Sequence, residues 1–331
     1  MAHQLEIVNG KAMMAYAGET PWHELGTRVD SNLTPHEMLQ AAGLDWEVKK
    51  YPAYSTIPIL NKETGKFVDT RYNVGHSALV RESDKKILDV VTDDWNPVQN
   101  KEAFDFFLEF IASGGMEMHT AGSLKGGQIV WALAKVAESF ELFNGDKVDA
   151  YLQFTNFHKY GFSTDVRFTP IRVVCNNTLS LSLNTSVERM VKISHRREFK
   201  PEQAKEMLGI ATSKLKQYKE MVEFLGSKKA KNEDIVSYFQ RIFPSVTPRD
   251  PEKDKKELSR NAEQALSIME TQPGAEFAQG TWWTPFNAVT FMTDHLLGRS
   301  ADTRMVSSWY GTSKKLKIKA LETAIEMAEA S

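Results

Sequence analysis

The stretch WEVKKYPAYSTIPILNKETGKFVDTRYNVGHSALV, residues 46–80, gives the clearest indication of fold class in the chain. Its β-branched and aromatic residues form two extended runs, Tyr54–Leu60 and Phe67–Val80, on either side of the polar segment Asn61–Lys66. Gly65 in that segment suits a hairpin loop, because glycine readily adopts the positive φ that such loops need. We therefore predict an antiparallel hairpin here.

Short helices and strands are expected on both sides of this hairpin. Thr34, Pro35 and Glu37 have the spacing of a helix N-terminus, which predicts a helix over Thr34–Gly43. Asn100 is expected to cap a second amphipathic helix that ends at Gly114–Gly115. Further strands are expected at Trp46–Tyr54, Lys86–Val91, Met116–Ser123, Gln128–Val136, Asp146–Phe154 and Ile171–Cys175. This mixture is typical of an α+β domain and not of a doubly wound sheet.

The chain is expected to become helical after Pro201. Apolar residues there repeat at alternating spacings of four and three, which is a heptad seam: Ala204, Leu208, Ala211, Leu215, Tyr218, Val222 and Leu225. The seam either packs within the chain or meets another subunit. We predict an α+β protein with an antiparallel, strand-rich part containing helices over residues 1–200 and a helical part packed on it over residues 201–331.

Composition excludes several classes of protein. The chain has 331 residues and a formal net charge of −2, so no general excess of positive charge indicates a polyanionic partner. The single cysteine, Cys175, excludes intramolecular disulfides and a cysteine zinc cluster. No metal-ligand spacing or phosphate loop is present, so we expect no cofactor and no metal. The N-terminus has no features of a secretory signal, and no apolar run approaches the roughly 20 residues that span a bilayer. A cytoplasmic protein without a membrane partner is expected.

Positive charge is concentrated in one region of the chain. Residues 1–110 carry 11 Lys and Arg against 17 Asp and Glu, whereas residues 189–229 carry 11 against 5. The segment NFHKYGFSTDVRFTPIRVVCNNTLSLSLNTSVERMVKISHRREFK, residues 156–200, adds amides and aromatic rings to these cations. No acidic pair, metal-ligand spacing or phosphate loop accompanies them. The segment indicates either a local anion-binding face or an ordinary solvated surface.

On the first interpretation the segment binds single-stranded nucleic acid. Arginine binds phosphate through two parallel hydrogen bonds, lysine adds a point charge, and aromatic rings stack on any base. The expected phosphate-binding residues are Arg167, Arg172, Arg189, Lys192, Arg196, Arg197 and Lys200. The expected stacking residues are Phe157, Tyr160 and Phe168, with Phe162 as a further aromatic ring in the same stretch. The expected neutral donors to phosphate or sugar are Asn176, Asn177 and His195.

Two other classes of function remain open. One is an enzyme acting on a nucleic acid or nucleotide, with His158, His195, Asp165 and Glu188 as candidate acid and base groups. The other is a phage structural or interaction protein that uses the heptad seam and the basic face to meet other proteins. The sequence pI of about 6.5 is below the value usual for nucleic-acid-binding domains, which counts against the first interpretation.

Four phrases carry a family resemblance: TPHEMLQAAGLDWEV (34–48), TPIRVVCNNTLSLSL (169–183), KISHRRE (192–198) and WTPFNAVTFMTDHLLGR (283–299). Together they resemble the phage/plasmid-like protein family of bacterial mobile elements, the domain of unknown function 932. The resemblance extends from Trp22–His23 to the final helix, and it implies a mobile-element role in a bacterial cytoplasm. The strand-rich half is similar at fold level to single-strand annealing proteins. We therefore expect a homo-oligomeric, phage-type strand-annealing factor that binds single-stranded DNA and catalyses no bond chemistry.

Overall fold

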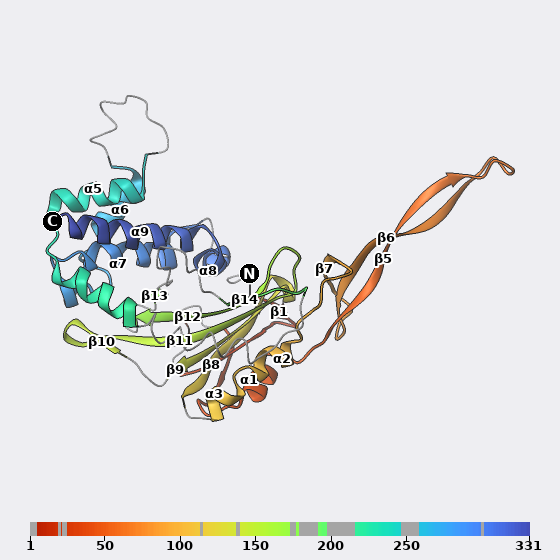
Figure 1. Ribbon diagram of the computed structural model, residues 1–331, viewed down its shortest axis with the longest axis horizontal. Coiled ribbons are helices and arrows are strands. Elements are labelled where there is room, and N and C mark those ends of the chain that lie inside the picture. Colours follow the sequence, from red (N-terminus) through yellow and green to blue (C-terminus); the bar gives the residue numbers. More distant parts are fainter. Residues whose placement is uncertain are drawn as a thin grey trace.

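A nine-stranded sheet forms the centre of the molecule, a smaller sheet projects from one end, and helices gather at the other end (Figure 1). The computed structural model describes residues 5–18, 21, 25–112, 115–136, 140–172, 177–178, 191–196, 216–245, 258–298 and 301–331. Strands dominate the N-terminal half and helices follow from residue 216 onward, which confirms the predicted α+β class. The predicted domain boundary at residue 200 lies outside the described residues and stays a prediction.

The large sheet is antiparallel except for one parallel pair at its edge. Its main strands, in spatial order, are β13 (Asn177–Thr178), β12 (Thr164–Arg172), β11 (Asp146–Phe157), β9 (Ile129–Val136), β8 (Met116–Leu124), β3 (Met14–Ala17) and β4 (Thr27–Val29). Two short strands join this path, β10 (Phe140–Leu142) beside β11 and β14 (Val191–Ile193) beside β12. A separate two-stranded ribbon pairs β1 (Ile7–Val8) with β2 (Lys11–Ala12).

Strand β12 corrects one prediction from the sequence. It begins at Thr164 and pairs with β11 from Thr155↔Asp165 to Val148↔Arg172, whereas we expected a strand over Ile171–Cys175. Residues 173–176 lie outside the described part. The first half of β12 alternates polar and apolar residues from Asp165 to Phe168, so a strand signal was present there, although Pro170 interrupts the run.

Helices cover both faces of the large sheet (Figure 1). On one face lie three short helices, α1 (Pro35–Ala41), α2 (Asn100–Asp105) and α3 (Leu108–Ala112), which share a hydrophobic core with Leu152 and Phe154 of β11. On the other face lies α8 (Ala301–Tyr310), whose Trp309 packs edge-on against Trp131 at a centroid distance of 5.1 Å. Alternate residues of each strand therefore meet different helices, as the two-residue period of a strand requires.

Local signals predicted α1 well and the next helix less well. The Thr34 side chain and the Glu37 carboxylate form a reciprocal capping box at the start of α1, which confirms the predicted N-terminus. Gln99, and not Asn100, is the cap of α2, and the single helix expected from Asn100 to Gly114 is interrupted between α2 and α3. Phe106 and Phe107 are both fully buried at this interruption. A regular helix would direct two adjacent side chains about 100° apart, so it would bury both less readily.

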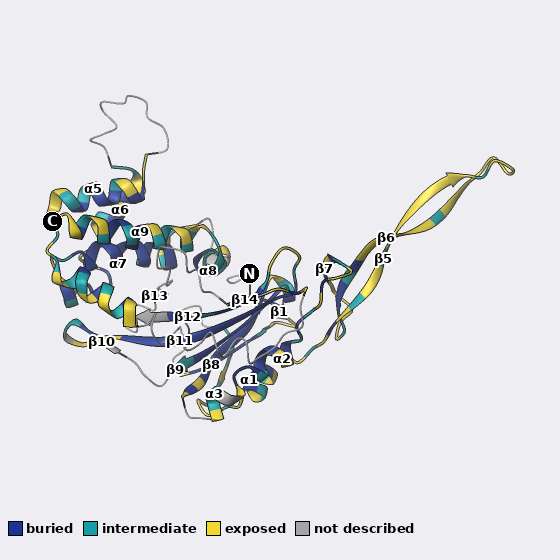
Figure 2. Cartoon of the chain, viewed as in Figure 1, coloured by how far each residue is buried: buried dark blue, intermediate teal, exposed yellow. Residues whose placement is uncertain are grey.

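The predicted hairpin is confirmed and forms a projecting arm. Strand β5 (Val48–Leu60) pairs with β6 (Phe67–Arg81), and β6 pairs with β7 (Ile87–Thr92) near the body of the molecule. Beyond β7 the two strands continue alone, and we call residues 51–75 the arm. Figure 2 shows that the arm is exposed along most of its length, unlike the large sheet.

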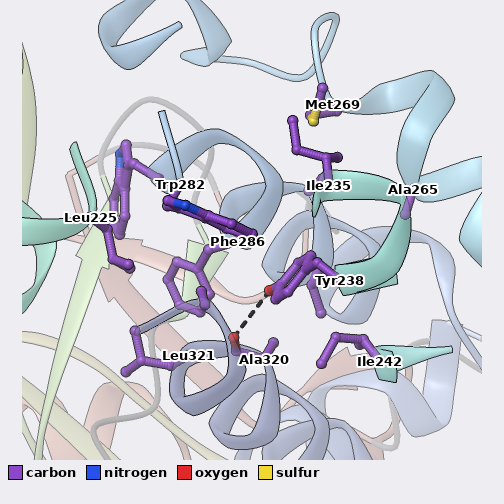
Figure 3. Packing of buried hydrophobic residues seen from close by; sticks show 14 of the residues in the cluster. Leu225, Ile235, Tyr238, Ile242, Ala265, Met269, Trp282, Phe286, Ala320 and Leu321 are labelled. Atoms are coloured by element: carbon purple, nitrogen blue, oxygen red, sulfur yellow. Dashed lines mark hydrogen bonds between the residues drawn. The ribbon is translucent and has the colours of Figure 1, made fainter. Parts of the chain in front are cut away.

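The helical region has its own hydrophobic core (Figure 3). Its described helices are residues 216–227, α5 (Asn232–Ile242), α6 (Arg260–Ile268), α7 (Trp283–Phe291), a π-helical turn (Met292–Leu296) and α9 (Thr312–Glu329). The core includes Leu142 and Val148 from the sheet, so the two regions share one packed interior at this end. Among the described residues, no helix has both the length and the hydropathy needed to cross a membrane.

The C-terminal half of the heptad seam packs inside the subunit. Tyr218, Val222 and Leu225 are buried in the helical core together with Tyr238 and Phe286. The N-terminal half of the seam, from Ala204 to Leu215, lies outside the described residues. The described half therefore supports the chain's own core and offers no surface to another subunit.

Replacement of Leu225 by alanine tests this placement. Leu225 has 0% exposure, so Leu225→Ala is expected to lower the free energy of unfolding by about 2–5 kcal/mol through lost burial and a residual cavity. Urea denaturation followed by circular dichroism measures the change. The control Glu223→Ala alters an exposed residue of the same helix and is expected to change stability by about 0.5 kcal/mol or less. Unchanged stability with altered subunit assembly would place the seam between subunits.

Candidate nucleic-acid interface

The loop between β11 and β12, residues 158–163, lies against two other segments and encloses a small pocket with them. The pocket has a volume of about 190 Å³. Its walls come from the segment after β7, from the loop itself and from the residues after β14: Trp95, Tyr160, Gly161, Phe162, Ser163, Ser194, His195 and Arg196. Three segments that are far apart in sequence thus meet at one end of the large sheet.

Main-chain hydrogen bonds hold these segments together. The His158 amide donates to the Gln128 carbonyl at 2.9 Å, and the Tyr160 amide donates to Oδ2 of Asp89 at 2.8 Å. The Asn96 amide donates to the His195 carbonyl at 2.7 Å. The loop is therefore fixed at its start by Gln128, just before β9, and in its middle by Asp89 of β7, which gives its exposed side chains a defined position.

A buried polar network lies beneath the pocket. The His195 ring stacks on Trp95 at a centroid distance of 4.0 Å, and its Nδ1 lies 3.0 Å from the Asn96 carbonyl oxygen. Nε2 of His158 lies 2.9 Å from Oδ1 of Asn100. Because carbonyl oxygens only accept hydrogen bonds, each of these ring nitrogens carries the proton. The network connects the β7–α2 segment, the end of β11 and the residues after β14.

Both imidazoles of this network are neutral near pH 7. Burial, assisted by His195 and Arg81, lowers the pKa of His158 to about 3. Burial lowers the pKa of His195 to about 4, against the opposing effect of its hydrogen bond to Asn96. His195 was expected to donate to phosphate or sugar, but it is only 3% exposed and its protonated Nδ1 already donates to the Asn96 carbonyl oxygen. That expectation is wrong, because the His195 ring forms a buried part of the pocket wall.

Exposed aromatic rings occur on the loop, and they differ in part from those expected. Tyr160 and Phe162 are each 47% exposed. Phe157 is 3% exposed, because it is the last residue of β11 and packs beneath Phe162 at 5.0 Å and against Tyr310 at 5.4 Å. Phe157 therefore cannot stack on a base as expected, and Phe162 presents its ring in that place.

Three cations lie around the loop. Arg196 is exposed, with its Nε 3.2 Å from Oδ2 of Asp94. The Lys159 ammonium lies 5.9 Å from the centre of the Phe162 ring. Lys125, from the turn between β8 and β9, lies near it: burial lowers the pKa of Lys125, and the Lys159 ammonium lowers it further. We call Lys125, Lys159, Tyr160, Phe162 and Arg196 the loop surface.

Sequence reasoning missed two members of the loop surface. Lys159 lies between His158 and Tyr160, both of which were singled out in the sequence. Its position next to Tyr160 and near Phe162 could have indicated that it belongs to the same surface. Lys125 lies more than 30 residues earlier in the chain, within the segment AGSLKGG. Nothing local in that segment indicates proximity to residue 159, because only the pairing of β8, β9 and β11 brings the two together.

Arg167 has internal partners and does not face the loop surface. Its guanidinium contacts the Asp165 carboxylate with Nη2 at 2.5 Å from Oδ2, and its Nη1 donates to the Trp309 carbonyl at 3.0 Å. It also lies over the Tyr310 ring at 5.1 Å. The expected phosphate contact by Arg167 is therefore wrong, since this arginine joins α8 to the sheet.

The remaining expected residues fall at the limit of the described part of the chain. For four of them only the main chain is described, in β12, β13 and β14: Phe168, Arg172, Asn177 and Lys192. Four others lie outside the described residues: Asn176, Arg189, Arg197 and Lys200. Their expected roles stay predictions.

The buried imidazoles predict a specific pH dependence of stability. An unfolded histidine takes up a proton below about pH 6.5, whereas His195 and His158 resist protonation in the folded chain until about pH 4 and about pH 3. The unfolded state binds more protons in that window, so the free energy of unfolding falls as pH falls, by up to about 1.4 kcal/mol per pH unit for each imidazole. His119, half-buried on the other face of the sheet, adds to the same trend, because desolvation lowers its pKa to about 4.

Urea unfolding between about pH 7.5 and about pH 5 measures this slope. His158→Gln is expected to flatten it, whatever its effect on stability at neutral pH, because one proton-uptake site of the unfolded state is lost. His76→Gln, at an exposed position near the base of the arm, is the matched control and should keep the wild-type slope. An equal slope in His158→Gln and wild type would contradict this assignment.

Comparison with known proteins identifies the family and no activity. The family model described as Domain of unknown function (DUF932) matches residues 87–314. No curated protein and no solved structure matches the chain. The matched range contains the whole loop surface and most of the helical region, and it leaves out the arm. The chain therefore belongs to the DUF932 family, in agreement with the resemblance found in its sequence.

Proposed function

We propose that this protein binds single-stranded DNA through the loop surface and acts as a strand-annealing factor of phage-type recombination. One observation carries the proposal: two half-exposed aromatic rings, Tyr160 and Phe162, lie beside cations that come from separate loops and turns of the chain. Aromatic rings that stack on bases, together with cations that follow the backbone, form the usual sequence-tolerant surface for single strands. In this proposal no residue forms or breaks a covalent bond.

The electrostatics of the lysine pair support an anionic ligand. Among the described residues, the charge that acts on Lys125 is the Lys159 ammonium and not a carboxylate. Two neighbouring ammonium groups repel each other, and one of them is partly withdrawn from water. A phosphate between them would relieve this repulsion, and charge-assisted hydrogen bonds would add to the gain. The nearby Arg196 could contact the adjacent phosphate.

Only a few phosphates can meet one loop surface. With three cations engaged, the logarithm of the affinity should fall with the logarithm of salt concentration with a slope of about −2. Such a small contact holds a long strand weakly, so we propose that the protein works as a homo-oligomer that presents several loop surfaces. We place this activity in the cytoplasm of the bacterium that carries the mobile element.

The candidates for acid–base catalysis do not converge in the described structure. Thr164 and His195 meet at 3.4 Å on one side of β12, whereas Asp165 pairs with Arg167 under α8 on the other side. His158 is fully buried, and Glu188 lies outside the described residues. No described observation favours an enzyme over a binding protein.

Fluorescence anisotropy with a labelled oligothymidine of about 20 nucleotides tests the proposal. Binding should be measurable at about 50 mM salt and much weaker at about 200 mM. Lys159→Glu should weaken binding and reduce the salt slope by about 0.7 or more, because one phosphate contact is lost and a repulsion is added. Phe162→Ala should weaken binding by about 5- to 150-fold, the range for one lost base stack, with the salt slope unchanged.

A matched control separates the loop surface from general charge effects. Lys231→Glu makes the same charge change at an exposed position before α5, in the helical region. This variant should bind like wild type. Failure of wild type to bind the oligonucleotide at low salt would rule the proposal out, and equal losses in Lys159→Glu and Lys231→Glu would show that the loop surface is not the site.

A further inference from the structure

One edge of the arm lacks a partner strand among the described residues. β7 pairs with β6 only over residues 76–80, from His76↔Thr92 to Val80↔Ile87. Residues 67–75 of β6 therefore have β5 on one side and no described strand on the other. The backbone N–H and C=O groups that point outward there are available to pair with another chain.

The arm also exposes apolar side chains that an isolated ribbon cannot bury. Phe67 is 71% exposed, Val68 50%, and Tyr72 44%, and Ile57 and Ile59 of β5 are exposed as well. The register places Ile57 opposite Thr70 and Ile59 opposite Val68. These four residues therefore share one face of the arm, and that face carries no charge. A two-stranded hairpin alone is marginally stable in water, whereas more strands with a common apolar face are stable.

The two edges of the arm differ in their capacity to pair. β5 contains Pro52 and Pro58, which lack a backbone N–H, and proline on an edge strand discourages pairing. Residues 67–75 of β6 contain no proline. The β6 edge is therefore the one that is suited to receive another strand.

We propose that residues 67–73 of β6 pair antiparallel with the same residues of a second copy of the chain, about a two-fold axis at Thr70. Asp69 then lies opposite the partner's Arg71, and Arg71 lies opposite the partner's Asp69. Val68 lies opposite the partner's Tyr72, and Thr70 lies opposite itself. Opposite charges, an aromatic ring with a β-branched residue, and two threonines are the cross-strand pairs that stabilise antiparallel sheets.

Charge selects this register over its neighbours. An axis at Asp69 or at Arg71 would place that charge directly opposite its own copy, which is destabilising. Within the described chain neither residue forms an ion pair, and Arg71 only stacks over Tyr54 at 4.0 Å. The charges of Asp69 and Arg71 therefore find complementary partners in the second copy.

The chemistry of the arm fits a protein partner better than a nucleic acid. Residues 51–75 carry three cations, Lys62, Lys66 and Arg71, against the two carboxylates of Glu63 and Asp69. Such a small excess gives little attraction for a polyanion. Pairing two copies produces a four-stranded sheet whose uncharged face continues across the axis, and a two-fold axis of this kind closes the assembly at a dimer.

A charge exchange tests the pairing. Sedimentation velocity at micromolar concentrations should show a dimer for wild type. Arg71→Asp alone should raise the dimer dissociation constant by about tenfold or more, since both cross-strand ion pairs become like-charge pairs. Asp69→Arg alone should do the same, and the double variant Asp69→Arg/Arg71→Asp should restore the dimer because both ion pairs re-form in exchanged order.

Cysteine cross-linking tests the register directly. In a Cys175→Ser background, Thr70→Cys places two thiols opposite each other across the axis, at a Cα separation of about 4.5–5.5 Å that a disulfide accepts. Oxidation should yield a covalent dimer. Thr56→Cys, on β5 and opposite Arg71 within the chain, is the matched control and should form no covalent dimer on oxidation.

These results are separable from nucleic-acid binding, because the arm contributes no residue to the loop surface. A monomeric wild type without cross-linking at residue 70 would overturn the inference. A dimer that persists unchanged in both single charge variants would also overturn it. Restoration of the dimer by the double variant, together with cross-linking at residue 70 alone, would establish it.

Discussion

Strand β11 imposes the constraint on which the rest of the molecule depends. Every residue from Val148 to Phe157 is buried, so each polar side chain on it requires a hydrogen-bonding partner from another element. Gln153 and Thr155, on one face, both meet the Tyr310 hydroxyl, at 3.0 Å and 2.7 Å, and thereby fix α8. On the other face Asn156 donates to the Val98 carbonyl at 2.8 Å and fixes the segment that leads into α2. Polar satisfaction of one central strand thus positions helices on both sides of the sheet.

Charge in the sequence and charge on the surface differ because of this constraint. Arg167 contributes to the basic count of its segment, but the fold uses it to pair Asp165 and to bind the end of α8. Lys317 is a second example, since the fold buries it against Asp294 at 2.9 Å. Lys159 is a half-buried loop residue, and among the described residues no carboxylate pairs with its ammonium. A net charge of −2 is therefore compatible with a local cationic surface. A count of charged residues does not distinguish cations that have internal partners from cations that have none.

The sequence predicted those features that depend on neighbours in the chain. The capping box of α1 and the hairpin of β5 and β6 need only local residues, and both were found. The start of β12 was missed although Asp165 to Phe168 alternate polar and apolar residues, and the Asp165–Arg167 ion pair within the strand accounts for the burial of both charges. Phe157 and Phe162 could not be told apart, since only the end of β11 decides which ring is buried. Lys125 joins the loop surface through sheet pairing, which no local pattern reveals.

Arm pairing and the loop surface, if both operate, strengthen each other through geometry. Antiparallel pairing of the two β6 strands sends the two bodies in opposite directions from the axis, so each body carries its loop surface at the base of its own arm. A DNA strand bound at one loop surface would then meet the second loop surface intramolecularly, at an effective concentration set by the rigid arms. Three cations and two rings give modest affinity alone, and the gain from linkage is largest for such weak sites. A strand too short to reach both surfaces receives none of this gain, so affinity should depend on strand length and not only on composition.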